Sequence, residues 1–133
     1  MKGLIVAAAL LQATGSMRVL ARGSQSFIDA RKEVVARSQA ELDAVWKMHA
    51  PNHTPPAVDF DREMVVGLFV GSKNTAGYSV EIADVAQGPN ALVVRYREQE
   101  PAKSAIVAQV ITSPYFLVAV PTYPGDVRFE KIQ

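Results

Sequence analysis

The sequence predicts an α+β protein, in which about seven short strands form a mostly antiparallel sheet, as a sandwich or partial barrel, with one early amphipathic helix. Short apolar or alternating runs recur between turn residues, and a capping box opens one helix-like stretch. One run, residues 64–70, is apolar on both faces, which indicates a strand covered on both sides. The strand-like runs are residues 17–22, 32–36, 64–70, 78–85, 91–99, 105–112, 115–120 and 127–132.

The first part of the chain contains two strand candidates and the helix. Residues 32–36 fit a short strand or a first helical turn, and β-branched Val34 and Val35 favour the strand. Ser38-x-x-Glu41 is a capping box, in which the Ser38 hydroxyl accepts from the amide three residues on and Glu41 reaches back to the amide of Ser38.

The helix that follows the capping box places Leu42 and Trp46 on one face, so we expect Trp46 to lie in the core. Pro51 ends this helix.

The second half of the chain reads as successive strands. Residues 78–85 alternate with Tyr78 facing inward, and residues 91–99 alternate as a half-solvated antiparallel strand does. Residues 105–112 and 115–120 are two further apolar strands, separated by Ser113-Pro114. A turn at residues 124–126 leads into the closing strand.

Composition narrows the function classes. The 133 residues are half apolar and one fifth charged, which favours one packed domain. The net charge of +1, with scattered basic residues, gives no electrostatic reason to expect nucleic acid or an anionic membrane surface as a partner. The chain has no cysteine, so disulfides, cysteine metal sites and thiol nucleophiles are excluded. We expect no cofactor and no metal site.

Residues 1–15 have the layout of a secretory signal peptide. Lys2 precedes an apolar run of roughly ten residues, and small residues follow up to a cleavage point after Gly15. The run is shorter than the roughly 20 residues that span a bilayer, so stable membrane insertion is not expected. We therefore predict an exported protein, periplasmic or secreted, with one domain at residues 16–133. The alternative is that residues 1–15 begin the fold as an ordinary strand.

No catalytic centre is evident in the sequence. His49 and His53 are four residues apart, but Pro51 interrupts the helix between them and the glutamate of the zinc-protease motif is absent. We interpret both as surface histidines near a helix end. No serine lies in a Gly-x-Ser-x-Gly elbow. The protein is thus expected not to be an enzyme, with a hydrolase that uses His49 or His53 as an alternative.

The loop at residues 71–78, between two strand-like runs, is the strongest candidate for a binding site. Its candidate partner-binding residues are Lys73, Asn74, Thr75, Gly77 and Tyr78. Asn74 and Gly77 tolerate left-handed backbone angles, Asn74 and Thr75 would supply hydrogen bonds, Gly77 the bend, and Tyr78 an aromatic anchor. The alternative is a plain strand connector.

Three blocks together resemble the PrcB C-terminal domain family. They are residues 58–67, the run from Gly71 through residues 75–82, and residues 112–121. Trp46-x-x-His49 at the helix end also fits, so the resemblance covers roughly residues 30–130. The resemblance implies a non-catalytic domain that assists the assembly or stability of an exported protease, with that protease or its subunit as the partner.

Two positions depart from the family pattern. Lys73-Asn74 stands where Arg-Pro is common, and Phe116 stands where a histidine is common. Residues 74–78 are also similar to the Asn-Pro-Thr-Thr-Gly-Tyr loop of chagasin-like cysteine-protease inhibitors, without its proline. The alternative function is therefore direct inhibition of a protease by the loop at residues 71–78.

Overall fold

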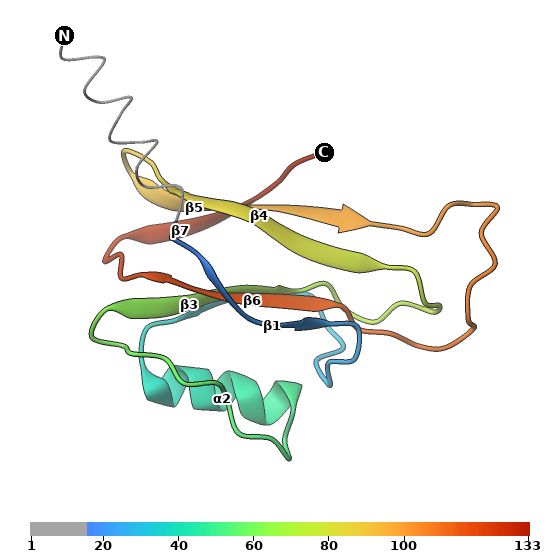
Figure 1. The fold of residues 1–133 in the computed structure, drawn as a ribbon, viewed down its shortest axis with the longest axis horizontal. Helices are drawn as coiled ribbons and strands as arrows, with labels where there is room; N and C mark the ends of the chain where they lie inside the picture. Colours follow the sequence, from blue (N-terminus) through green and yellow to red (C-terminus); the bar gives the residue numbers. More distant parts are fainter. Residues whose placement is uncertain (1–15) are drawn as a thin grey trace, which may run out of the picture.

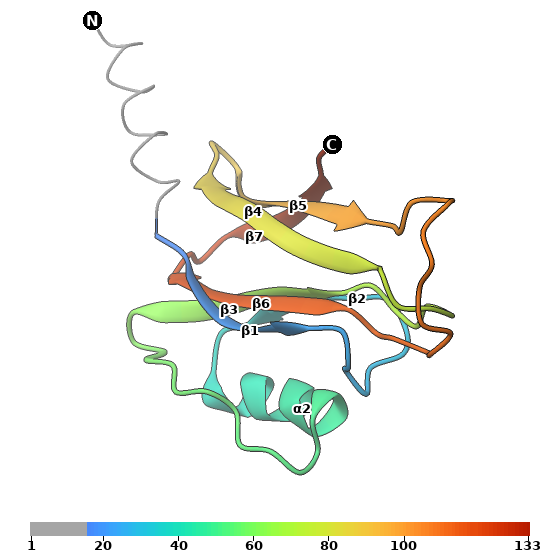
Figure 2. The same ribbon diagram turned by 45° about the vertical axis from the view of Figure 1, so that its right-hand side comes forward.

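The computed structural model describes residues 16–133 as two β-sheets and one helix in three layers (Figures 1 and 2). The predicted signal peptide lies outside the described residues. The elements, in chain order, are β1 (Arg18–Gly23), β2 (Lys32–Ala36), α2 (Gln39–His49), β3 (Glu63–Phe69), β4 (Ser79–Gln87), β5 (Ala91–Gln99), β6 (Tyr115–Pro121) and β7 (Asp126–Lys131). Within this part of the chain, no helix is long and apolar enough to cross a membrane.

The two sheets form a sandwich. The first has the order β1-β6-β3-β2, and all of its neighbouring strands are antiparallel. The second has the order β4-β5-β7, in which β4 and β5 are antiparallel and β5 and β7 are parallel. Neither sheet closes into a barrel. The predicted fold class, α+β with a mostly antiparallel sheet and one early helix, is confirmed.

Strand β3 lies in the middle layer and is covered on both sides, as predicted. Its residues Met64, Val66 and Leu68 are buried in the core between the two sheets. Val65 and Phe69, which alternate with them, are buried in a second core beneath α2. A strand reads as continuously apolar in sequence when both of its faces are buried in this way.

Helix α2 is fixed at both ends by its flanking residues. The Ser38 hydroxyl accepts from the amide of Glu41 at 3.2 Å, which confirms the predicted cap. The Glu41 carboxylate accepts from the amide of Arg37 at 2.6 Å, one residue before the predicted partner Ser38. The helix ends at His49, two residues before Pro51. Trp46 is buried in the core beneath the helix, as predicted.

The prediction of a strand at residues 105–112 is wrong. Residues 101–112, here called the arm, run outside the two sheets and have no regular secondary structure (Figure 1). Ile106 is fully exposed and Ile111 is 70% exposed. Isoleucine and valine favour strands because they pack well on a half-buried pleated surface, and the arm has no such surface beneath it.

Candidate functional site

The loop at residues 71–78 joins β3 of one sheet to β4 of the other. The chain bends at Gly71, with a φ of +88°, and the amide of Ser72 donates to the carbonyl of Asp29 at 3.0 Å. It bends again at Gly77, with a φ of +97°, as the sequence predicted for the backbone there. Asn74 does not use the left-handed angles that it could tolerate: among the described residues, positive φ occurs only at these two glycines.

The loop is tied to the arm by backbone and side-chain hydrogen bonds. Lys73 and Thr112 exchange two backbone bonds, of 2.7 and 3.0 Å. The amide of Ala76 donates to the carbonyl of Ala108 at 3.0 Å, and the buried hydroxyl of Thr112 donates to the carbonyl of Thr75 at 2.9 Å. Residues 72–76 and 108–112 are thus joined by one isolated antiparallel β-bridge and two further hydrogen bonds, and this pair of segments is here called the loop–arm ribbon. These bonds tie the middle of the loop to the arm.

The five predicted site residues differ in what they offer a partner. Asn74 is exposed, whereas Lys73, Thr75 and Tyr78 are half-buried. The Thr75 hydroxyl donates to the carbonyl of Ala76 at 2.9 Å, so its hydrogen bond is made within the loop. The Lys73 ammonium lies 5.5 Å from the centre of the Tyr78 ring, within cation–π range. The lysine charge, the aromatic ring and the free Asn74 amide therefore form the accessible part of the site.

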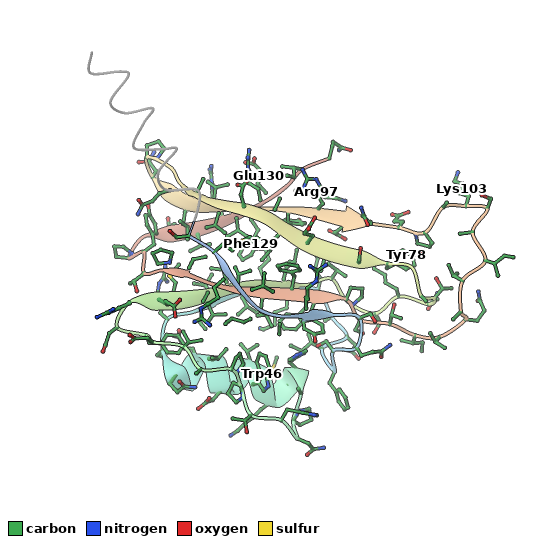
Figure 3. The ribbon with its side chains drawn as sticks, viewed as in Figure 1. Trp46, Tyr78, Arg97, Lys103, Phe129 and Glu130 are labelled. Atoms are coloured by element: carbon green, nitrogen blue, oxygen red, sulfur yellow. The ribbon has the colours of Figure 1, made fainter. Side chains whose placement is uncertain are left out.

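Figure 3 shows Tyr78 and Lys103 at the end of the sandwich where the arm projects. The arm brings Pro101 and Val107 against Gly77. A Cβ atom placed on Gly77 would lie 2.8 Å from the Cβ of Pro101 and 3.3 Å from a methyl of Val107. Glycine at this position is therefore required by the backbone angle and by the neighbouring arm alike.

His49 is not the surface histidine that the sequence suggested. Its side chain is 4% exposed and lies among three aromatic rings, with centroid distances of 4.8 Å to Trp46, 5.4 Å to Phe69 and 4.3 Å to Tyr115. Burial lowers the pKa of the His49 imidazole, and the charge of nearby His53 lowers it further. The prediction failed because a helix-end position was taken to be exposed, whereas the segment before β2 covers it.

The imidazole holds that segment in place. His49 Nδ1 lies 2.8 Å from the Ser26 hydroxyl, which accepts from the amide of Ile28 at 3.0 Å and is therefore free to donate its own proton to the ring. The carbonyl of His49 accepts from the amide of Phe27 at 3.0 Å. Ser26 is itself buried, so this hydrogen bond lies in the interior of the protein. Among residues 16–133, no group of three or more potential ligand side chains could hold a metal ion.

Comparison with known proteins identifies the family of the central segment. Residues 64–121 match the model of a family described as PrcB C-terminal. The match runs from β3 to β6 and contains the loop, the arm and both halves of the loop–arm ribbon. No curated protein and no solved structure gave a significant match. The match over residues 64–121 confirms the family resemblance that the sequence predicted.

One departure from the family pattern can now be placed in the fold. Phe116, where a histidine is common in the family, is 2% exposed in the core between the sheets. The Arg22 guanidinium lies 4.9 Å from the centre of its ring. Position 116 lies on β6, outside the loop–arm ribbon. The other departure, Lys73-Asn74, lies within that ribbon.

Proposed function

We propose that this protein is an exported, non-enzymatic interaction module that assists the assembly or stability of an extracytoplasmic protease. The observation that carries the proposal is the family match over residues 64–121, because this family is associated with a protease complex and the match spans the whole loop–arm ribbon. The proposed contact site consists of Lys73, Asn74 and Tyr78, supported from behind by the arm.

The geometry of the loop favours binding. Both ends of the loop are held by strands, and its middle is bonded to Thr112 and Ala108 of the arm. A segment that is already ordered loses little conformational entropy when it binds, so more of the contact energy remains as affinity. The exposed Asn74 amide and the half-buried Lys73–Tyr78 pair supply polar and aromatic contacts at that fixed position.

The two alternative functions gain less support from the contacts. An inhibitory loop must enter an active-site cleft, but the amide of Ala76 and the hydroxyl of Thr75 are bonded within this protein. A hydrolase would need an accessible histidine with a proton-transfer partner. The imidazole of His49 and its partner Ser26 are both buried.

The proposal is tested by affinity capture from the envelope fraction of the native host, followed by mass spectrometry. Wild-type protein is compared with Asn74→Arg, which adds a long charged side chain at the exposed centre of the loop. Asn90→Arg is the matched control, because Asn90 is an exposed turn asparagine beyond the opposite end of β4.

We expect wild type and Asn90→Arg to retain a protease or a protease subunit and Asn74→Arg to lose it. The half-life of that protease should also fall when the loop variant replaces wild type. Equal retention by all three proteins would contradict a role for the loop. Proteolysis assays with the captured protease address the inhibitor alternative, because an inhibitor would lower its activity instead of extending its lifetime.

A further inference from the structure

The backbone of the arm is largely unpaired. Within the described residues, the amides of residues 106–111 donate no backbone hydrogen bond. Ala108 and Thr112 form backbone hydrogen bonds with the loop, so these groups lie on the side of the arm that faces it. When such a segment pairs as a strand, neighbouring residues direct these groups to opposite sides, so Val107, Gln109 and Ile111 would present theirs away from the loop. Such an edge is a template for another strand.

The side chains of the arm are suited to that use. Residues 104–112 carry no charge, and Ile106, Val110 and Ile111 are 102%, 49% and 70% exposed. A row of exposed β-branched residues without charge lacks the protection that natural edge strands normally carry. The arm is therefore unlike the edge strand β2, whose first two residues, Lys32 and Glu33, are charged and exposed.

The order of these side chains favours a second copy of the same segment as the partner. Residues 106–111 read Ile-Val-Ala-Gln-Val-Ile, which has nearly the same order of side-chain types in both directions. Antiparallel self-pairing centred on Ala108 places Ile106 opposite Val110 of the second copy. Self-pairing centred on Gln109 places Val107 opposite Ile111. Both registers create apolar cross-strand pairs, which stabilise sheets, and neither places like charges opposite each other.

We propose that the protein forms a two-fold symmetric dimer through antiparallel pairing of the arms of two copies. The loop–arm ribbon of each copy would join across the axis into four segments in the order loop, arm, arm, loop. Three or more paired segments are far more stable than an isolated pair. Assembly stops at two copies because the inner edge of each arm is already bonded to its own loop.

The dimer would carry one loop at residues 71–78 on each outer edge of this four-segment sheet. The contact is small, since it consists chiefly of one short segment from each copy, and small interfaces are weak or transient. We therefore expect a reversible dimer with micromolar or weaker affinity. Its existence does not depend on the proposed protease partner.

Analytical ultracentrifugation over a concentration series up to millimolar tests this proposal on the purified protein. Wild type should shift from the mass of one chain towards the mass of two. The double variant Ile106→Lys, Val110→Lys should remain at one-chain mass, and its circular dichroism should be unchanged because both side chains are exposed. Met48→Lys, on an exposed apolar position of α2, is the control and should dimerise as wild type does.

The absence of cysteine allows a second readout of the same contact. Under mild oxidation, Ala108→Cys or Gln109→Cys should give a disulfide-linked dimer, because a residue on the symmetry axis lies opposite its own copy at disulfide distance. Ala102→Cys, at the exposed start of the arm, should not.

Three results would overturn the proposal: one-chain mass at every concentration, a dimer that survives both lysine substitutions, or equal cross-linking at position 102. If wild type forms no dimer but the arm variant Ile106→Lys, Val110→Lys no longer captures the protease, the arm would instead bind the protease partner.

Discussion

At the scale of single residues, the site depends most clearly on Gly77. Its φ of +97° lies in a region that residues with a Cβ atom rarely adopt, and the arm occupies the space where a Cβ would lie. The sequence predicted the bend, because glycine before Tyr78 in a polar loop indicates a turn. It did not predict the steric requirement, because Pro101 and Val107 approach Gly77 through tertiary structure alone.

We expect Gly77→Ala to lower the free energy of unfolding by about 1–3 kcal/mol, through backbone strain and displacement of the arm. Urea denaturation measures this loss. Gly88→Ala is the control: Gly88 has no positive φ, and its added Cβ would come no closer than 3.2 Å to the nearest atom, the carbonyl oxygen of Ala91. A loss at position 77 no larger than that at position 88 would refute the steric argument.

The buried His49 makes stability depend on pH. Burial lowers its pKa in the folded protein below the ordinary value of 6.5, so the unfolded chain binds the proton more tightly. Stability then decreases as the pH falls from the unfolded value towards the lowered folded value, and it is constant with respect to this group below both.

We predict that the free energy of unfolding decreases as the pH falls below about 7, and that His49→Gln removes most of this decrease. Chemical denaturation at several pH values measures the slope. His53→Gln should keep it, because His53 is exposed and adds only the smaller of the two effects on His49. An unchanged slope in His49→Gln would show that other groups cause the pH dependence.

At the scale of elements, local sequence signals predicted two kinds of element correctly: those that neighbouring residues stabilise, and those whose apolar pattern reflects burial. The helix follows from the capping box and the apolar spacing of Leu42 and Trp46, and β3 follows from its continuous apolar run. The arm shows the opposite case. Residues 105–112 have the composition of a strand, yet their backbone bonds reach only the loop and, from Ala105, the carbonyl of Ala102, so composition alone gave the wrong element.

The helix cap yields a quantitative test at this scale. Ser38→Ala removes the acceptor for the amide of Glu41 and should lower stability by about 1 kcal/mol. Thermal and urea denaturation report the change. Ser104→Ala, in an exposed part of the arm, should alter stability by less than about 0.5 kcal/mol. Equal effects at positions 38 and 104 would mean that the cap contributes nothing.

At the scale of the whole molecule, the fold separates a packed interior from a site at one end. The cores on the two sides of the first sheet share β3 and β6, which lie at its centre. The loop and the arm connect the two sheets, and their ribbon lies where both connections leave the sandwich (Figure 2). The location of the loop could be read from the chain. Its bonds to Thr112 could not, because they join residues far apart in the chain, such as Thr75 and Thr112, which are 37 positions apart.

The measurement that tests the central claim most directly is site-specific photo-cross-linking in the native host. A photoreactive amino acid replaces Asn74 in the loop or, as the control, Asn90 at the far end of β4. The account predicts that position 74 cross-links to an exported protease or one of its subunits and that position 90 does not. No protease product at position 74, or the same product at both positions, would contradict it.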